Sequence, residues 1–163
     1  MYLPFDSLPD HARIWIYQAD RELLQDELIQ IEALLRKFCE SWNAHQQPLQ
    51  SSYAIEHKRF IILAVNEQVY AASGCSIDSS VAVIRQIETN CQVSLTNRLI
   101  QAIKTHSGIE TKSLKLLKEE LAEGIIDPDT LTFNNLVPNI GEFKKAWVTP
   151  IKDSWLGRYV PVS

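Results

Sequence analysis

The feature that most constrains the fold is Phe60–Val65, the longest uninterrupted apolar run in the chain. A strand that is apolar at every position must be buried on both faces, so it lies inside a sheet that other elements cover. The run is far shorter than the roughly 20 residues needed to cross a bilayer. The sequence therefore predicts a central strand, and no membrane insertion.

Three elements surround this run in the first half of the chain. Residues 13–17 predict a first strand, because β-branched and aromatic side chains follow a Pro-Asp pair. Residues 21–44 predict a helix capped by Asp20, with an apolar stripe at spacings of three and four. Residues 51–65 predict two strands joined by a tight turn near His57 and Lys58.

The next segments decide the topology. Residues 79–91 predict a second helix, with Ser76 or Asp78 as its cap. Residues 95–105 fit either a strand or a helix, and we favour the strand. The strand gives the order β-α-β-β-α-β of ferredoxin-like domains, whereas a helix would break that analogy. We thus expect an α+β fold: a ferredoxin-like unit with a mixed or antiparallel sheet and two main helices on one face.

The last third predicts a helical C-terminal extension, with a helix after Ser113 and a short strand at residues 131–133. We expect one domain over residues 1–163, with a core of about 10–110 and an extension of about 111–163. Five large apolar side chains then recur at every fourth position, and Pro150 interrupts them. They are Phe143, Trp147, Ile151, Trp155 and Tyr159. Trp147 and Trp155 are interaction candidates, although large aromatic residues more often form core.

Composition excludes several classes of function. Sixteen Lys and Arg residues against 20 Asp and Glu give a net charge of −4, which argues against nucleic acid and anionic lipid as partners. The five glycines are spread singly, so neither a Walker loop nor a dinucleotide fingerprint is present. The four histidines share no metal-ligand spacing. We expect no cofactor and no metal.

The cysteines and the N-terminal residues indicate the cellular compartment. Cys39, Cys75 and Cys91 are odd in number and widely spaced, which is typical of reduced thiols. The first residues carry no basic region followed by an apolar stretch, so they do not resemble a secretory signal. We expect a cytoplasmic protein.

Residues 73–80 form the most unusual segment, because small polar side chains precede a predicted helix. A helix N-terminus attracts anions and lowers the pKa of a thiol, so this loop is a candidate ligand site. The alternative is that its hydroxyls only cap the helix and the thiol packs as a small hydrophobe. The candidate residues are Ser73, Gly74, Cys75, Ser76, Asp78 and Ser79.

These residues leave three hypotheses for function. The first is a non-enzymatic binding or protein-interaction module that contacts a small molecule or protein through residues 73–80 and the aromatic C-terminal segment. The second is a thiol-dependent enzyme with Cys75 as nucleophile and His57, or else His11, as the possible base. The third is a homodimer that pairs through a sheet edge or the tryptophans. Four further polar residues face either a cleft or, more commonly for such residues, a turn or the solvated surface: Asn134, Asn135, Asp153 and Arg158.

Three segments together resemble a known family. They are residues 12–18 (ARIWIYQ), residues 72–80 (ASGCSIDSS), and residues 133–136 (FNNL) with residues 153–155 (DSW). The chain, from Met1 to about Tyr159, resembles a family of small uncharacterised bacterial proteins often labelled "ABC transporter ATPase". The resemblance implies a bacterial protein of similar fold and supplies no activity. The glycine spacing excludes the Walker loop that such an ATPase needs, so the sequence does not support the label.

Overall fold

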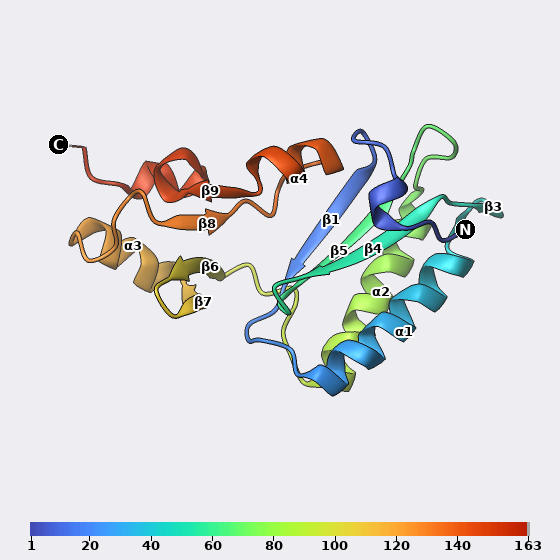
Figure 1. Cartoon of the computed structure of the whole chain (residues 1–163), viewed down its shortest axis with the longest axis horizontal. Helices are drawn as coiled ribbons and strands as arrows, with labels where there is room; N and C mark the ends of the chain where they lie inside the picture. The colour runs from blue at the N-terminus through green and yellow to red at the C-terminus, as the bar shows by residue number, and fades with distance from the viewer. Residues whose placement is uncertain (163) are drawn as a thin grey trace.

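The computed structural model describes residues 1–162 and confirms the α+β fold (Figure 1). The helices are α1 (Gln25–Ser41), α2 (Gly74–Cys91), α3 (Leu114–Ala122) and α4 (Ile140–Ala146), with short 3-10 turns η1 (Phe5–Ser7), η2 (Ile151–Asp153) and η3 (Trp155–Tyr159). The strands are β1 (Arg13–Gln18), β2 (Asn43–Ala44), β3 (Gln47–Pro48), β4 (Ser51–Glu56), β5 (Phe60–Val65), β6 (Ile100–Thr105), β7 (Gly108–Ser113), β8 (Leu131–Phe133) and β9 (Val148–Pro150). Every pairing between these strands is antiparallel.

The first sheet has the order β1-β5-β4, so the apolar run forms its central strand as predicted. All residues of β5 are buried. Helices α1 and α2 cover one face of this sheet (Figure 1), and one core cluster joins them to it. The predicted turn between β4 and β5 is present: three residues separate the paired Glu56 and Phe60, and two of them, His57 and Lys58, have positive φ angles of 51° and 52°.

Residues 100–105 form a strand, which resolves the open choice at residues 95–105 and keeps the predicted order along the chain. In space, however, β6 belongs to a second sheet with the order β7-β6-β8-β9. Both edges of β6 are occupied there: β7 pairs with one edge through the hairpin at Gly108, and β8 pairs with the other through Ile103 and Thr132, so neither edge is left for β1. A ferredoxin-like sheet would place this strand beside β1; here β1 stays at the edge of its sheet.

Both main helices begin elsewhere than predicted. Asp20 does not cap α1; its carboxylate accepts a hydrogen bond from Ser94 N at 3.1 Å. The first turn of α1 is capped by Glu27, whose side chain accepts from Leu24 N at 2.8 Å. Helix α2 begins at Gly74 with Ser73 as its N-cap, earlier than a cap at Ser76 or Asp78 would place it.

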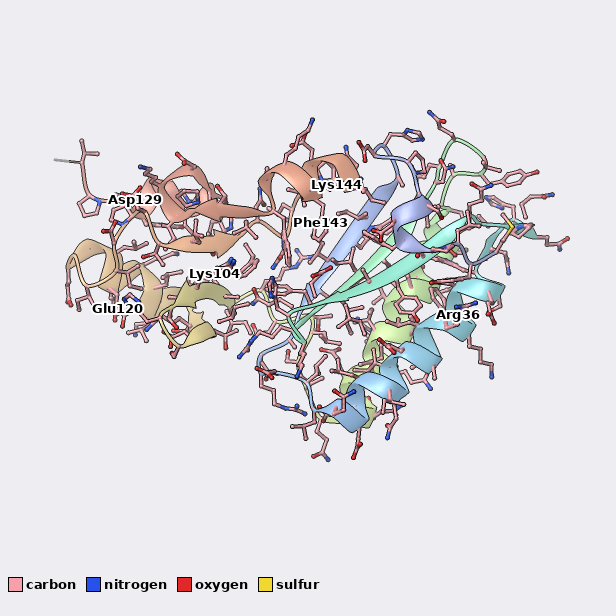
Figure 2. The ribbon with its side chains drawn as sticks, viewed as in Figure 1. Arg36, Lys104, Glu120, Asp129, Phe143 and Lys144 are labelled. Carbon is pink, nitrogen blue, oxygen red and sulfur yellow. The ribbon has the colours of Figure 1, made fainter. Side chains whose placement is uncertain are left out.

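A second core cluster lies on the other face of the first sheet and joins it to α4, β8 and the N-terminal segment. Phe143 of α4 (labelled in Figure 2) packs on Trp147 and Phe5, with ring centroids 4.7 Å and 6.2 Å away. The predicted boundary near residue 110 falls inside β7. The aromatic residues of the extension do not form one helical stripe, because β9 and two 3-10 turns follow α4.

Candidate functional site

A groove of about 890 Å³ runs along the free edge of β1, between the two sheets. Residues 14–18 all line it, and successive residues of a strand point to opposite faces, so the groove must follow the edge itself. Residues 95–98 form one wall, residues 135–139 form the other, and Ile100, Gln101 and Trp155 complete the lining. Figure 1 shows this side of β1 facing β6 and β8.

At its N-terminal end the edge of β1 is already paired. Ile14 N donates to Pro138 O at 3.1 Å, and Ile140 N donates to Ala12 O at 3.1 Å. In an antiparallel pair, alternate residues turn their backbone groups to one side, so the even-numbered residues of β1 face away from β5. The next residues that face the groove are therefore Ile16 and Gln18.

At its C-terminal end the edge is closed again by Asp20 N, which donates to Ser94 O at 3.0 Å. Between these two closures, no hydrogen bond among residues 1–162 uses the backbone N–H or C=O of Ile16 or Gln18. These groups point into the groove. A partner that pairs with them would complete the sheet on this side.

The side chain of Gln18 holds the second sheet against this edge. Its Oε1 accepts from Ala102 N at 3.1 Å and from Asn135 Nδ2 at 3.3 Å, and its Nε2 donates to Ile100 O at 3.4 Å. Only 7% of Gln18 is exposed. The Gln18 side chain thus makes the hydrogen bonds to β6 that a neighbouring backbone would otherwise make. These bonds hold β6 close to β1 at this end of the groove.

Aromatic side chains of β1 and an exposed apolar side chain of residues 135–139 both belong to the groove lining. Trp15 and Tyr17 turn to the helix-covered face, where Trp15 packs on Trp42 at 6.0 Å between centroids. Burial raises the pKa of Tyr17, so its hydroxyl stays protonated. On the opposite wall Leu136 is 79% exposed, an unusual position for a large apolar side chain next to a groove.

The ionisable groups of the groove carry more positive than negative charge. Arg13 pairs with Glu67 at 3.3 Å. The ring of His11 lies 3.3 Å from Asn66 Oδ1. Arg98 has no ion pair or hydrogen bond to any other part of residues 1–162. An uncompensated guanidinium on the wall favours an anionic group on whatever occupies the groove.

The predicted loop at residues 73–80 is the cap and first turns of α2, and none of its residues lines the groove. Ser76 is 2% exposed; its Oγ donates to Ser73 O at 2.8 Å and accepts from Ser73 N at 2.7 Å. The Oγ of Ser79 donates to Cys75 O at 2.9 Å. The hydroxyls are thus engaged in the helix, and Gly74, Cys75 and Asp78 are exposed.

Cys75 and His57 are not brought together. His57 is in the turn before β5, and Cys75 follows the loop after β5, so a strand of about 17 Å separates them. The His57 ring stacks on Trp147, with 5.8 Å between centroids. Cys39 and Cys91 are buried, and burial raises the pKa of both thiols, that of Cys39 to about 12.

The two interaction tryptophans have different positions. Trp147 is 5% exposed and packs in the second core, where its Nε1 donates to Asn135 Oδ1 at 3.0 Å and so holds the wall. Trp155 lines the groove directly. Asn135 also lines it, as its cleft interpretation predicts. The sequence reasoning missed the edge of β1 and residues 95–98, since no local pattern shows which strand lacks a neighbour.

No protein-family model, curated protein or solved structure matches the chain. Within residues 1–162, no group of three or more His, Cys, Asp or Glu side chains is arranged to hold a metal ion. No helix in the described part of the chain has the length and apolar character to cross a membrane. The family resemblance stays a prediction.

Proposed function

We propose that this protein is a non-enzymatic interaction module that binds an extended peptide segment along the free edge of β1. The observation that carries the proposal is the unpaired backbone of Ile16 and Gln18, which faces the groove. Strand addition to an exposed edge is a common way to bind peptides, because the main chain supplies affinity and side-chain pockets supply specificity.

The dimensions favour a single strand as the occupant. The free backbone groups extend from Ile16 to Gln18, about 7 Å of edge at the usual rise per residue, enough for a segment that pairs over about three residues. The edge is bounded by residues 135–139 at its N-terminal end, where Pro138 accepts from Ile14, and by residues 95–98 at its C-terminal end, next to the contact between Asp20 and Ser94. A short extended segment would fit between these two closures. The volume of about 890 Å³ lies within the range of ligand sites.

The variant Ile16→Pro tests the proposal. Proline removes the N–H that faces the groove and leaves the bonds between β1 and β5 intact, since edge strands tolerate proline on their outer side. Heptapeptides selected by the wild type from a random library would be measured by fluorescence anisotropy. We expect Ile16→Pro to weaken their binding at least about fivefold, because a lost hydrogen bond leaves a peptide carbonyl unpaired. The control Ile16→Val keeps the N–H and should bind within twofold.

A second measurement needs no variant and guards against misfolding of Ile16→Pro. Amide exchange of the wild type should be fast at Ile16 and Gln18 in the free protein and slow once a selected peptide is bound. If the library yields no binder, or if binders protect other amides and tolerate Ile16→Pro, the proposal is wrong.

We also place this activity in the cytoplasm. The support is that all three cysteines, Cys39, Cys75 and Cys91, are free thiols, and two of them are buried. A thiol titration of protein from native lysate should find all three reduced; a disulfide in that sample would argue for an oxidising compartment.

A further inference from the structure

We infer that the bound segment carries an Asp or Glu side chain that pairs with Arg98, and this inference rests on the proposed peptide docking. Alternate side chains of the same segment would be apolar. The inference restricts the class of partner to an extended acidic and apolar segment, bound as a fourth strand on the β1 edge of the first sheet.

Charge is the first argument. The whole chain has a net charge of −4, yet the groove is lined by two arginines, Arg13 and Arg98, against one carboxylate, Glu67, with His11 and the protonated Tyr17 as the other ionisable groups. Glu67 is already engaged by Arg13 at 3.3 Å. The groove is therefore a positive site on a negative protein, and Arg98 is its uncompensated cation. Complementary charge both attracts an acidic segment and rejects basic ones.

Position is the second argument. Arg98 lies in the wall between Ser94, whose carbonyl accepts from Asp20 N, and Ile100, whose carbonyl accepts from Gln18 Nε2. Both contacts lie at the C-terminal end of β1. The carboxylate is therefore expected beside Gln18, at one end of the bound segment.

The alternation of side chains along a strand predicts which residues flank the carboxylate in the bound segment. In an added strand, successive side chains point to opposite faces of the sheet. The wall that holds Arg98 also holds Leu95, which belongs to the core cluster under α1 and α2. The other wall offers Val137 of the second core and the exposed Leu136. Residues of the segment that neighbour the carboxylate in sequence thus face an apolar surface.

We assign the carboxylate to a side chain and not to a chain terminus. The end of the free edge is occupied by the bond from Asp20 N to Ser94 O, whereas Arg98 stands on the wall beside it. A side chain that projects from the strand reaches a wall, whereas a terminal carboxylate continues along the edge.

The test compares matched peptides on matched variants. Heptapeptides selected as above are made with both termini blocked and with Glu, Gln or Lys at the acidic position. On the wild type we expect the Glu form to bind about two- to fivefold more tightly than the Gln form, the usual range for an exposed ion pair. Arg98→Gln should abolish this difference, and Arg98→Glu should prefer the Lys form. Arg85→Gln, which alters an exposed arginine of α2 outside the groove lining, should change nothing.

Each negative result would refute a different part of the two proposals. Equal binding of the Glu and Gln forms, with both lost in Ile16→Pro, would refute the role of Arg98 and leave the peptide docking intact. Tighter binding of a Gln peptide with a free C-terminus than of the blocked Glu peptide would refute the assignment to a side chain. A wild-type dimer in light scattering that dissociates in Ile16→Pro would assign the edge to a second copy and overturn both proposals.

Discussion

The amide of Gln18 joins the first sheet to the second, and its removal can be predicted quantitatively. In the variant Gln18→Met a side chain of similar length and no hydrogen-bonding capacity takes its place. Ala102 is fully buried, and Gln18 Oε1 at 3.1 Å is the acceptor for its N–H. The variant therefore leaves a buried N–H without a partner.

The magnitude follows from this one orphaned group. An unsatisfied buried donor costs about 1–3 kcal/mol, and the other two contacts of Gln18, at 3.3 Å and 3.4 Å, are long enough to contribute little. We expect a loss of about 2 kcal/mol in the free energy of unfolding. For a chain of this size, that loss lowers the melting temperature by about 4–8 °C.

The assay is urea unfolding followed by tryptophan fluorescence, with thermal unfolding alongside. Gln30→Met makes the same chemical change on the exposed face of α1 and should stay within about 0.5 kcal/mol of the wild type. Should Gln18→Met prove as stable as this control, Ala102 N must find another acceptor, and the account of how the sheets are joined would be refuted.

Two further predictions concern the helices and the C-terminal turns. The hydrogen bond from Arg21, then that from Leu24 N, lowers the pKa of Glu27 to about 2; its stabilising effect is present above its unfolded pKa and is lost as pH falls toward 2, so Glu27→Gln should flatten the acid limb of a stability–pH curve. A curve unchanged in Glu27→Gln would contradict this. A Cβ at Gly157 would overlap the carbonyl oxygen of Lys152, whereas one at Gly74 meets nothing within 4 Å. Gly157→Ala should therefore destabilise by about 1–3 kcal/mol, and Gly74→Ala should be neutral or stabilising by up to about 1 kcal/mol in the same unfolding assay; equal effects would refute the predicted overlap.

The sequence predicts elements well where local pattern decides them. The run Phe60–Val65 had to be a central strand because both of its faces are apolar, and the turn at His57 and Lys58 follows from the strands on either side. Helix boundaries are harder to predict from the sequence. Asp20 has the right chemistry for a cap, but Ser94 competes for its carboxylate from far along the chain.

The groove cannot be predicted from any local pattern in the sequence. Its existence depends on β6 joining the second sheet, where β7 and the distant β8 occupy both of its edges, while the Gln18 amide supplies the contact that remains between β1 and β6. The pattern of apolar residues at 100–105 predicts a strand, but it does not indicate which of the two sheets that strand joins. For Asn135 and Trp155 the sequence did offer a signal, since both were candidates for a cleft or an interaction surface, and both line the groove. Arg98 carried none.

The free edge of β1 also bears on how the protein avoids aggregation. Unpaired strand edges are templates on which other chains can stack, and natural proteins usually blunt them with charge, proline or a covering loop. Here Pro138 closes one end of the edge, and the two walls narrow the approach to it. These features would hinder pairing between this edge and the edge strands of other copies. Removing a wall, by shortening residues 135–139, should turn the same edge into a starting point for self-association.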